Sequence, residues 1–306
     1  MKPNEKFITI TNNRNLIMEF IQDMLIVPRQ KAHKWSKITN QTPNLKIGYP
    51  FQHLASLITG MQGNATGARG EDLIDGSEVK SCNKIDQADK CLECGQNILR
   101  IQQQCPYCFS TNIRRNNDSK WLIGVRNDDE LLMLKNETPR FILMVSDYPD
   151  FALKKFERIR IRSFEIWVKS PRCRNFIALM DSYYQNIFLK HKSINPNKNP
   201  APKNLFPDNY PFYMCNPIKT FECLIDEKLH INITHFVEPN ADRTCLDSEK
   251  MPKNLLKNNE ISTLKAKFID CDSIDFIDEK MRSYLSLRDS DKQIKIIGNK
   301  QHKALK

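Results

Sequence analysis

The chain has 306 residues, of which 40% are hydrophobic and 27% are charged, and its formal net charge at pH 7 is +11. No run of residues is as apolar as the ~20 residues of a membrane span, and the N-terminus lacks the apolar stretch of a signal peptide. The composition therefore predicts a cytoplasmic protein of one or two domains whose partner is anionic, with nucleic acid favoured over a membrane surface.

Two helices are predicted in the first sixty residues. Apolar residues from Leu16 to Ile26 recur with the spacing of one helix face, Asn13 is a suitable cap, and Pro28 is expected to end the helix. Residues 29–50 are basic and polar. The sequence PFQHLASLITG then predicts a second, short helix.

The distribution of glycine changes after this helix. Five of the nine glycines lie within the 17 residues from Gly60 to Gly76. Glycine is used where the backbone takes unusual dihedral angles or where another backbone comes close. We therefore expect this loop to let a phosphate backbone approach. It leads into LIDGSEV, two short apolar stretches around Asp75-Gly76, which predict a β-hairpin.

Acidic and basic side chains accompany this hairpin in the sequence GEDLIDGSEVKS. Glu78 and Lys80 are two residues apart, so on a strand they project to the same face. The carboxylate that joins them is Asp72 or Asp75. Asp75 stands in the turn, where its simplest role is to accept local backbone hydrogen bonds. A three-residue loop over 75–77 puts Asp72 on the face of Glu78 and Lys80, and a two-residue loop puts it on the opposite face, so Asp72 is favoured subject to loop length.

Two carboxylates and a lysine on one face can support phosphodiester hydrolysis. Carboxylates hold Mg²⁺, a hard ion that prefers oxygen ligands and keeps several waters. The ion polarises the phosphodiester and lowers the pKa of bound water, and a lysine can orient that water or offset charge in the transition state. A Glu-x-Lys triplet alone is more often a solvated strand face. The whole pattern, from the glycine-rich lead to the lysine, is what indicates a nuclease site.

Four of the ten cysteines have the spacing of a metal site. Cys91, Cys94, Cys105 and Cys108 form C-x2-C-x10-C-x2-C, which can place four thiolates around one tetrahedral Zn²⁺. Free thiols or a redox pair are the alternatives. A closed four-sulfur site leaves no position for substrate, so we assign it no catalysis and expect a structural zinc. The other cysteines are expected to be mostly reduced core thiols.

Further elements are predicted along the rest of the chain. They are strands over 120–126 and 140–148 with a helix or turn between them, a strand over 158–169, a helix from Ser170-Pro171, an irregular connection with five prolines over 195–211, and a strand over 212–225. On the 158–169 strand, Ile159 and Ile161 are expected on one face and arginines on the other. The pattern of residues 226–306 does not specify a fold.

Basic residues gather in the middle of the chain, where residues 151–200 contain 11 Lys/Arg against 3 Asp/Glu. A helix N-terminus favours a phosphate, and arginines beside it can read guanine edges. The candidate DNA-binding residues are Arg69, Lys169, Arg172 and Arg174. The alternative is that these side chains serve solubility. The same choice between DNA contact and plain surface applies to Arg100, Arg114, Arg115 and Lys120, around the cysteines.

The hairpin sequence GEDLIDGSEVKS resembles the catalytic hairpin of the PD-(D/E)XK nuclease superfamily. Over a longer span, GYPFQHLASLITG, GARGEDLIDGSEVKSC, the two CxxC pairs and FYMCNPIKTFEC resemble MamI-like type II restriction endonucleases. This resemblance covers most of residues 47–225. It implies that Asp72 and Glu78 bind the catalytic metal and that Lys80 is the catalytic lysine. Two features depart from the superfamily pattern. Glu71 replaces a frequent proline, and the preceding helix offers Gln52 and His53 in place of a further glutamate, which leaves one or two metals open.

The resemblance also implies an α/β (α+β) fold, with a mixed central sheet flanked by helices. We expect a nuclease domain over 1–225 with a zinc ribbon inserted at 88–112, and a C-terminal basic region over 226–306 as a candidate DNA-binding subdomain. The implied activity is Mg²⁺-dependent, sequence-specific hydrolysis of double-stranded DNA. A palindromic target would imply a homodimer, and a cognate DNA methyltransferase is the expected functional partner. The alternatives are a zinc-ribbon DNA-binding protein without catalysis and a repair or nicking nuclease.

Overall fold

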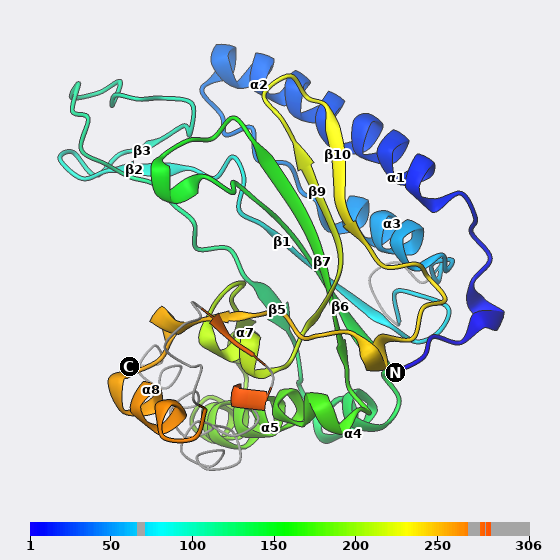
Figure 1. The fold of residues 1–306 in the computed structure, drawn as a ribbon. Helices are drawn as coiled ribbons and strands as arrows, with labels where there is room; N and C mark the ends of the chain where they lie inside the picture. The colour runs from blue at the N-terminus through cyan, green and yellow to red at the C-terminus, as the bar shows by residue number, and fades with distance from the viewer. Residues whose placement is uncertain (66–70, 269–275, 279, 283–306) are drawn as a thin grey trace.

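A five-stranded mixed sheet forms the centre of the molecule (Figure 1). The computed structural model describes residues 1–65, 71–268, 276–278 and 280–282. In spatial order the strands are β1 (Glu78–Asn83), β6 (Arg140–Asp147), β7 (Ile159–Trp167), β9 (Ile218–Ile225) and β10 (Ile231–Phe236). β1 runs parallel to β6, and the other neighbouring pairs are antiparallel. The predicted mixed sheet flanked by helices is confirmed.

Three helices cover one face of the sheet: α1 (Asn13–Ile21), α2 (Val27–Thr39) and α3 (Gly48–Thr59) (Figure 1). Every residue of β6 is buried, because helices lie on both faces and alternate side chains enter two cores. Ile142 and Met144 face the core under α1 and α3, where Ile159 and Ile161 of β7 join them. The predicted second helix is confirmed, and it ends at Gly60 with a left-handed φ of 70°.

The prediction that Pro28 ends the first helix is wrong. A wider π-helical turn over Gln22–Ile26 follows α1, and α2 then continues to Thr39, into the stretch that the sequence shows to be basic and polar. Pro28 stands in the first turn of α2, where a missing N–H is tolerated. The π-helical turn re-pairs the backbone there, since the N–H of Val27 donates to the carbonyl of Gln22, five residues back.

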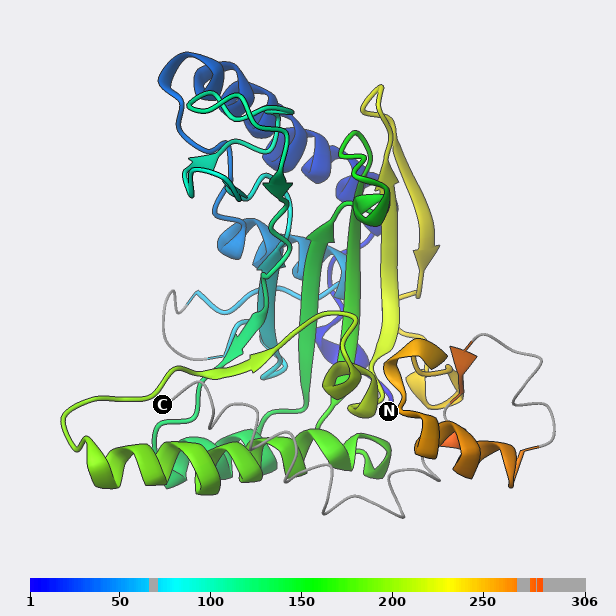
Figure 2. The same cartoon turned by 90° about the vertical axis from the view of Figure 1, so that its left-hand side faces the viewer.

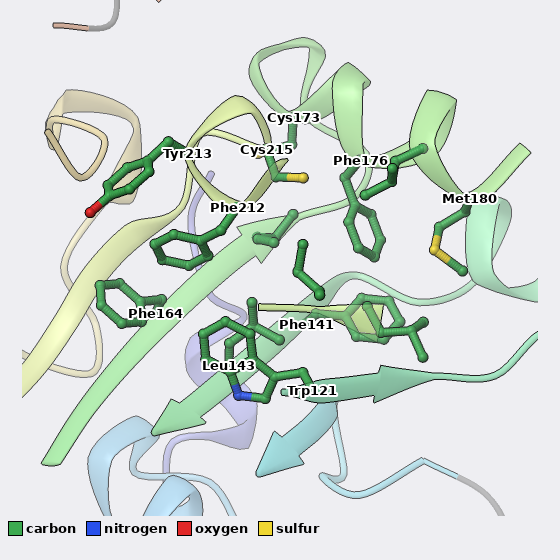
Figure 3. Packing of buried hydrophobic residues seen from close by; sticks show 14 of the residues in the cluster. Trp121, Phe141, Leu143, Phe164, Cys173, Phe176, Met180, Phe212, Tyr213 and Cys215 are labelled. Carbon is green, nitrogen blue, oxygen red and sulfur yellow. The ribbon is translucent and has the colours of Figure 1, made fainter. Parts of the chain in front are cut away.

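The opposite face of the sheet holds an aromatic core (Figure 3). Phe141 of β6 and Phe164 of β7 meet Phe176 and Phe212, with ring centroids 5.0 Å apart in each pair. The indole N–H of Trp121 donates to the carbonyl of Met144 at 2.8 Å, which fixes its strand against the sheet. The elements here are α4 (Asp128–Asn136), α5 (Arg174–Tyr183), α6 (Leu189–Ile194), α7 (Tyr210–Met214) and the strand pair β5 (Trp121–Ile123) and β8 (Lys203–Leu205).

The cysteine-rich segment forms a small three-stranded unit. Its strands are β2 (Asp89–Cys91), β3 (Asn97–Ile98) and β4 (Ile113–Arg114). Figure 2 shows this unit beside α2 at one end of the sheet, with the long rod formed by α5 and α6 at the other end. The insertion is therefore a separate unit on the sheet domain, as the predicted zinc ribbon requires.

The C-terminal part of the chain contributes to the main sheet. β10 pairs with β9 with Ile231 opposite Ile225, so the domain boundary expected at residue 225 falls between two neighbouring strands. The predicted 212–225 strand is β9 alone, because its first residues form α7 and a turn. Beyond β10 lie β11 (Met251–Pro252), α8 (Asn258–Lys265) and β12 (Phe276–Ile277). None of the described helices is long and apolar enough to cross a membrane.

Candidate active site

An open cleft of about 730 Å³ lies at the β1 edge of the sheet. The start of α3 lines it with Tyr49 and Gln52, and β1 lines it with Glu78 and Lys80. Residues from the end of β5 to α4, including Arg126, also line it. Asp72 lines the same cleft from the turn before β1. The structure thus brings the three predicted catalytic side chains into one hollow.

The turn before β1 differs from the predicted hairpin in the position of its loop and in the absence, among the described residues, of a regular strand before it. The N–H of Leu73 donates to the carbonyl of Ser77 at 3.1 Å, so the loop consists of residues 74–76 and starts one residue earlier than expected. Gly76 adopts a left-handed φ of 84°, which explains the glycine. β1 pairs with β6, and Leu73 forms an isolated bridge to Gly63. Among the described residues the incoming segment therefore forms no regular partner strand for β1.

Asp72 reaches the cleft because two groups hold its carboxylate. The backbone N–H of Val79 donates to Oδ2 at 2.7 Å, and Nε2 of Gln52 donates to Oδ1 at 2.5 Å. Burial raises the pKa of Asp72, the charge of Glu78 raises it further, and Lys80 acts against both. The pattern showed that Gln52 stands on this helix, but only the packing of α3 on β1 shows that it contacts Asp72.

Glu78 and Lys80 lie on the same face of β1, as their spacing predicts. Lys80 Nζ is 2.7 Å from Glu78 Oε2, and both side chains are partly exposed to the cleft. Val79, between them, points into the core under α3. The pair therefore places a cation directly beside a carboxylate at the mouth of the site, where a polar substrate can reach both.

Asp75 faces away from this chemistry. Its Oδ1 accepts the N–H of Ser77, the local turn bond expected for an aspartate at this place. Its Oδ2 lies 3.2 Å from Nη2 of Arg140, a fully buried side chain that also binds Ser77 Oγ and Glu165 at 2.9 Å. Through these buried contacts Arg140 connects the turn to the sheet. Neither Asp75 nor Arg140 lines the cleft.

The four cysteines of the ribbon converge on one point. All four Sγ atoms lie within 4.8 Å of one another, and the Cys91–Cys108 and Cys94–Cys105 pairs are 3.6 Å apart. Zn–S bonds of about 2.3 Å in a tetrahedron place sulfur atoms about 3.8 Å apart, so the set fits that ion. Burial opposes ionisation of Cys105, but backbone N–H groups of the knuckle hold its pKa below that of a free thiol.

The two cysteine pairs form equivalent turns. The N–H of Gly95 donates to the carbonyl of Cys91, and that of Phe109 donates to the carbonyl of Cys105. Gly95 and Phe109 have left-handed φ values of 73° and 62°. The second turn therefore places a phenylalanine where the first places a glycine, and this side chain is 70% exposed.

Arg100 and Arg115, considered above as DNA contacts or plain surface, have structural positions. Both bind the buried carboxylate of Asp89, at 2.9 and 2.8 Å. The guanidinium of Arg100 also lies over the rings of Tyr148, Phe151 and Phe156, at 4.8 to 5.8 Å. The Asp89 pairs lie within the ribbon, and the ring contacts attach it to the body of the molecule.

Lys169, Arg172 and Arg174 do not line the cleft. Lys169 and Arg172 line a second hollow of about 600 Å³ near the N-terminus, and no residue lines both hollows. The guanidinium of Arg172 donates to Ser248 Oγ at 2.8 Å, and Arg174 is exposed at the start of α5. Arg69 lies outside the described residues. The DNA-binding role of these four residues stays a prediction.

Comparison with known proteins shows which sequences this chain is similar to. A sequence model of the MamI restriction endonuclease family matches residues 34–254, more than half of the chain. The type II restriction enzyme MamI of Microbacterium ammoniaphilum is 39% identical over 75 residues, which are 24% of this chain and 24% of that enzyme. The similarity thus spans about a quarter of that relative's length. No solved structure matches the chain.

Proposed function

The chain belongs to the MamI restriction endonuclease family, and on that premise we propose that it is a type II restriction endonuclease that hydrolyses double-stranded DNA at a specific sequence. The observation that carries this proposal is the presence of Asp72, Glu78 and Lys80 in one open cleft. The basic net charge of +11 suits a DNA substrate. A DNA-binding protein without catalysis has no need for a lysine paired to a carboxylate in a hollow of this size.

Asp72 and Glu78 would hold a catalytic Mg²⁺. When bound, this ion polarises the scissile phosphodiester and lowers the pKa of a water molecule. The donor set fits a hard cation, since both side chains offer carboxylate oxygens at the cleft wall. Gln52 holds the Asp72 carboxylate through Oδ1, and the Val79 N–H holds it through Oδ2, so its direction is set before substrate arrives.

Lys80 supplies the positive charge that hydrolysis of a phosphodiester needs. Its ammonium group lies beside Glu78 and can turn toward a phosphate oxygen or the attacking water. Arg126, which also lines the cleft, is exposed and can bind a neighbouring phosphate of the same strand. The proposed reaction is direct attack by water, with no covalent bond to the enzyme.

Other parts of the account are proposals of the same kind. The four-cysteine cluster would hold a structural zinc ion that fixes the ribbon beside the nuclease domain. Such an enzyme would act in the cytoplasm with a cognate DNA methyltransferase. It would cut a palindromic site as a homodimer, since two-fold symmetry in the target matches that of a dimer.

Cleavage of plasmid DNA tests the proposal. Unmethylated plasmid is incubated with the protein and Mg²⁺, in parallel with the variants Asp72→Asn and Lys80→Met. We expect discrete fragments from the wild type and intact plasmid from the variants. A protein that binds DNA tightly but leaves many plasmids intact with several divalent ions would instead be a zinc-ribbon DNA-binding protein. A protein that only nicks would be a repair or nicking nuclease.

A further inference from the structure

The segment before residues 72–80, which carry the proposed catalytic side chains and are called the catalytic turn below, has an uneven charge. Residues 24–70 contain six lysine or arginine residues and no aspartate or glutamate. Arg29 is engaged in an ion pair with Asp86 at 2.6 Å. Lys31, Lys34 and Lys37 of α2 are exposed, as is Lys46 before α3. This part of the molecule therefore presents positive charge that no acidic residue of the same segment neutralises.

Exposed aromatic side chains accompany these lysines. Trp35 of α2 is 58% exposed, with Lys34 Nζ 5.8 Å from its ring centre. The second cysteine turn contributes Tyr107 and Phe109, which are 57% and 70% exposed. The side chains of Asn40 and Tyr107 are 3.5 Å apart, so the end of α2 and this turn are neighbours, as Figure 2 also shows. We call this set the α2–ribbon surface: Lys31, Lys34, Trp35, Lys37, Tyr107 and Phe109.

The connection between α2 and α3 links this surface to the cleft. Thr42 Oγ1 donates to the carbonyl of Asp86 at 2.8 Å, just before the ribbon. Asn83 Nδ2, at the end of β1, donates to Asn44 Oδ1 at 2.9 Å. The chain then passes Lys46 and enters the cleft wall at Gly48. It therefore follows β1 from the ribbon to the catalytic residues.

The dimensions of this path suit a DNA duplex. Glu78 and Asn83 are five strand steps apart, about 17 Å at ~3.3 Å per residue. A duplex with one phosphate charge per ~1.7 Å carries about ten phosphates over that length. The spaced lysines and Lys46 can therefore contact the backbone of a duplex whose neighbouring phosphodiester lies in the cleft. The second hollow, which Lys169 lines, is less suited to the same duplex. It shares no lining residue with the cleft, and the acidic residue Asp247 also lines that hollow.

We propose that the α2–ribbon surface binds the phosphate backbone of the double-stranded DNA that flanks the scissile bond. This inference rests on the proposed nuclease function and locates its substrate on the molecule. It assigns the ribbon a role in DNA binding through Tyr107 and Phe109, while Arg100 and Arg115 attach it to the body. It also predicts that backbone contacts made here are independent of base sequence.

The salt dependence of DNA binding tests this surface. Affinity for a duplex is measured without added Mg²⁺ over a range of salt concentrations, so that the DNA stays intact. Each phosphate contact contributes about 0.9 to the slope of log K against log salt. The variant Lys34→Gln/Lys37→Gln should therefore lower the slope by about 1.8. The control Lys190→Gln/Lys198→Gln removes two exposed lysines near the opposite end of the sheet and should leave the slope unchanged.

Tryptophan fluorescence gives a second readout. Of the three tryptophans in the chain, Trp121 and Trp167 are 0% and 9% exposed, so acrylamide reaches mainly Trp35. Bound duplex should protect this emission from quenching, and the protection should be lost in Trp35→Phe. Quenching of Trp35 that is the same with and without saturating duplex would overturn the proposal.

Two further outcomes separate the causes of failure. A wild type that cuts plasmid, while the α2 variant keeps the wild-type slope, would contradict this inference and leave the nuclease function intact. A wild type that neither binds nor cuts any duplex would contradict both. A variant with an altered sedimentation coefficient and an unchanged slope would show that the surface joins two copies of the chain, and would also overturn the proposal.

Discussion

The catalytic turn and the cysteine ribbon are both candidate metal sites, but they are built differently. The four cysteines reach one another through two local turns within 18 residues, and their sulfur atoms form a closed set. Asp72, Glu78 and Lys80 lie within nine residues, yet their arrangement depends on Gln52 from α3 and on Arg140 from β6. A closed site specified by local spacing suits a structural ion. An open site supported from distant parts of the chain suits catalysis.

Removal of metal from the ribbon should have the largest energetic effect. Structural zinc contributes about 10–16 kcal/mol to the folding of isolated zinc fingers. We expect Cys94→Ser to lower zinc content, measured by mass spectrometry, and to expose the ribbon to proteolysis. Cys245→Ser replaces an exposed cysteine outside the cluster and should keep full zinc content. The sheet should stay folded, because the ribbon has its own small core. Global unfolding of Cys94→Ser would contradict the separation of the two regions.

Loss of Gln52 should affect the catalytic turn and leave the ribbon unchanged. A group that orients a metal ligand typically contributes 10- to 100-fold in metal affinity or activity. We expect Gln52→Ala to raise the Mg²⁺ concentration for half-maximal cleavage by about this factor. His53→Ala is the matched control, since this neighbouring side chain is exposed and does not line the cleft. If both substitutions raised the required Mg²⁺ concentration equally, Gln52 would have no specific role in orienting Asp72, and α3 would only pack against β1.

The substitution Asp75→Asn tests whether Asp75 stabilises the turn or takes part in catalysis. The substitution weakens the contact with buried Arg140, so we expect a loss of stability of about 1–3 kcal/mol in urea unfolding. Cleavage below the melting temperature should stay within about tenfold of the wild type, because Asp75 does not line the cleft. A loss of activity as large as that of Asp72→Asn, with normal stability, would make Asp75 the metal ligand instead.

Asp86 lies between the two regions, and its effect should depend on pH. Burial alone would raise its pKa, but His33, whose Nε2 lies 3.1 Å from Oδ2, and the ion pair with Arg29 outweigh burial and hold the pKa well below its usual range. A lowered pKa stabilises the fold above the unfolded pKa of about 3.9, and this stability is lost as pH falls below it. We expect the wild type to lose about 1 kcal/mol more than Asp86→Asn between pH 5 and pH 3. Asn suits the φ of 53° at this position.

The sequence predicts the arrangement of the cysteine ribbon more completely than that of the catalytic turn. Spacing alone indicates the four-cysteine site, because CxxC pairs close within local turns. Alternation places Glu78 and Lys80 on one face, since the period of a strand is fixed. The loop of the catalytic turn was displaced by one residue, because a glycine at φ 84° and the buried carboxylate partners of Arg140 decide where it closes. Arg140 comes from β6 and its partner Glu165 from β7, and the pairing of these two strands cannot be read from the local pattern.

The same limit explains the other differences. A proline is read as the end of a helix, but the π-helical turn before Pro28 lets the chain remain helical. From the sequence alone, Arg100 cannot be told from a charged surface residue. In the structure it is buried, because it pairs with Asp89 and lies over the ring of Phe156. Positions of this kind depend on contacts between segments distant in the chain.

Single-turnover cleavage tests the central claim most directly. The rate on an end-labelled duplex is compared for the wild type, Asp72→Asn, Lys80→Met and the double variant, with duplex binding measured in parallel. Groups that act on one reaction centre have non-additive effects. We predict that each single variant loses at least about 10³-fold in rate, comparable to general acid–base or electrostatic catalysis. The double variant should be only slightly slower than either single variant, with binding retained. A rate for Asp72→Asn within tenfold of the wild type, or multiplicative losses in the double variant, would contradict a shared site.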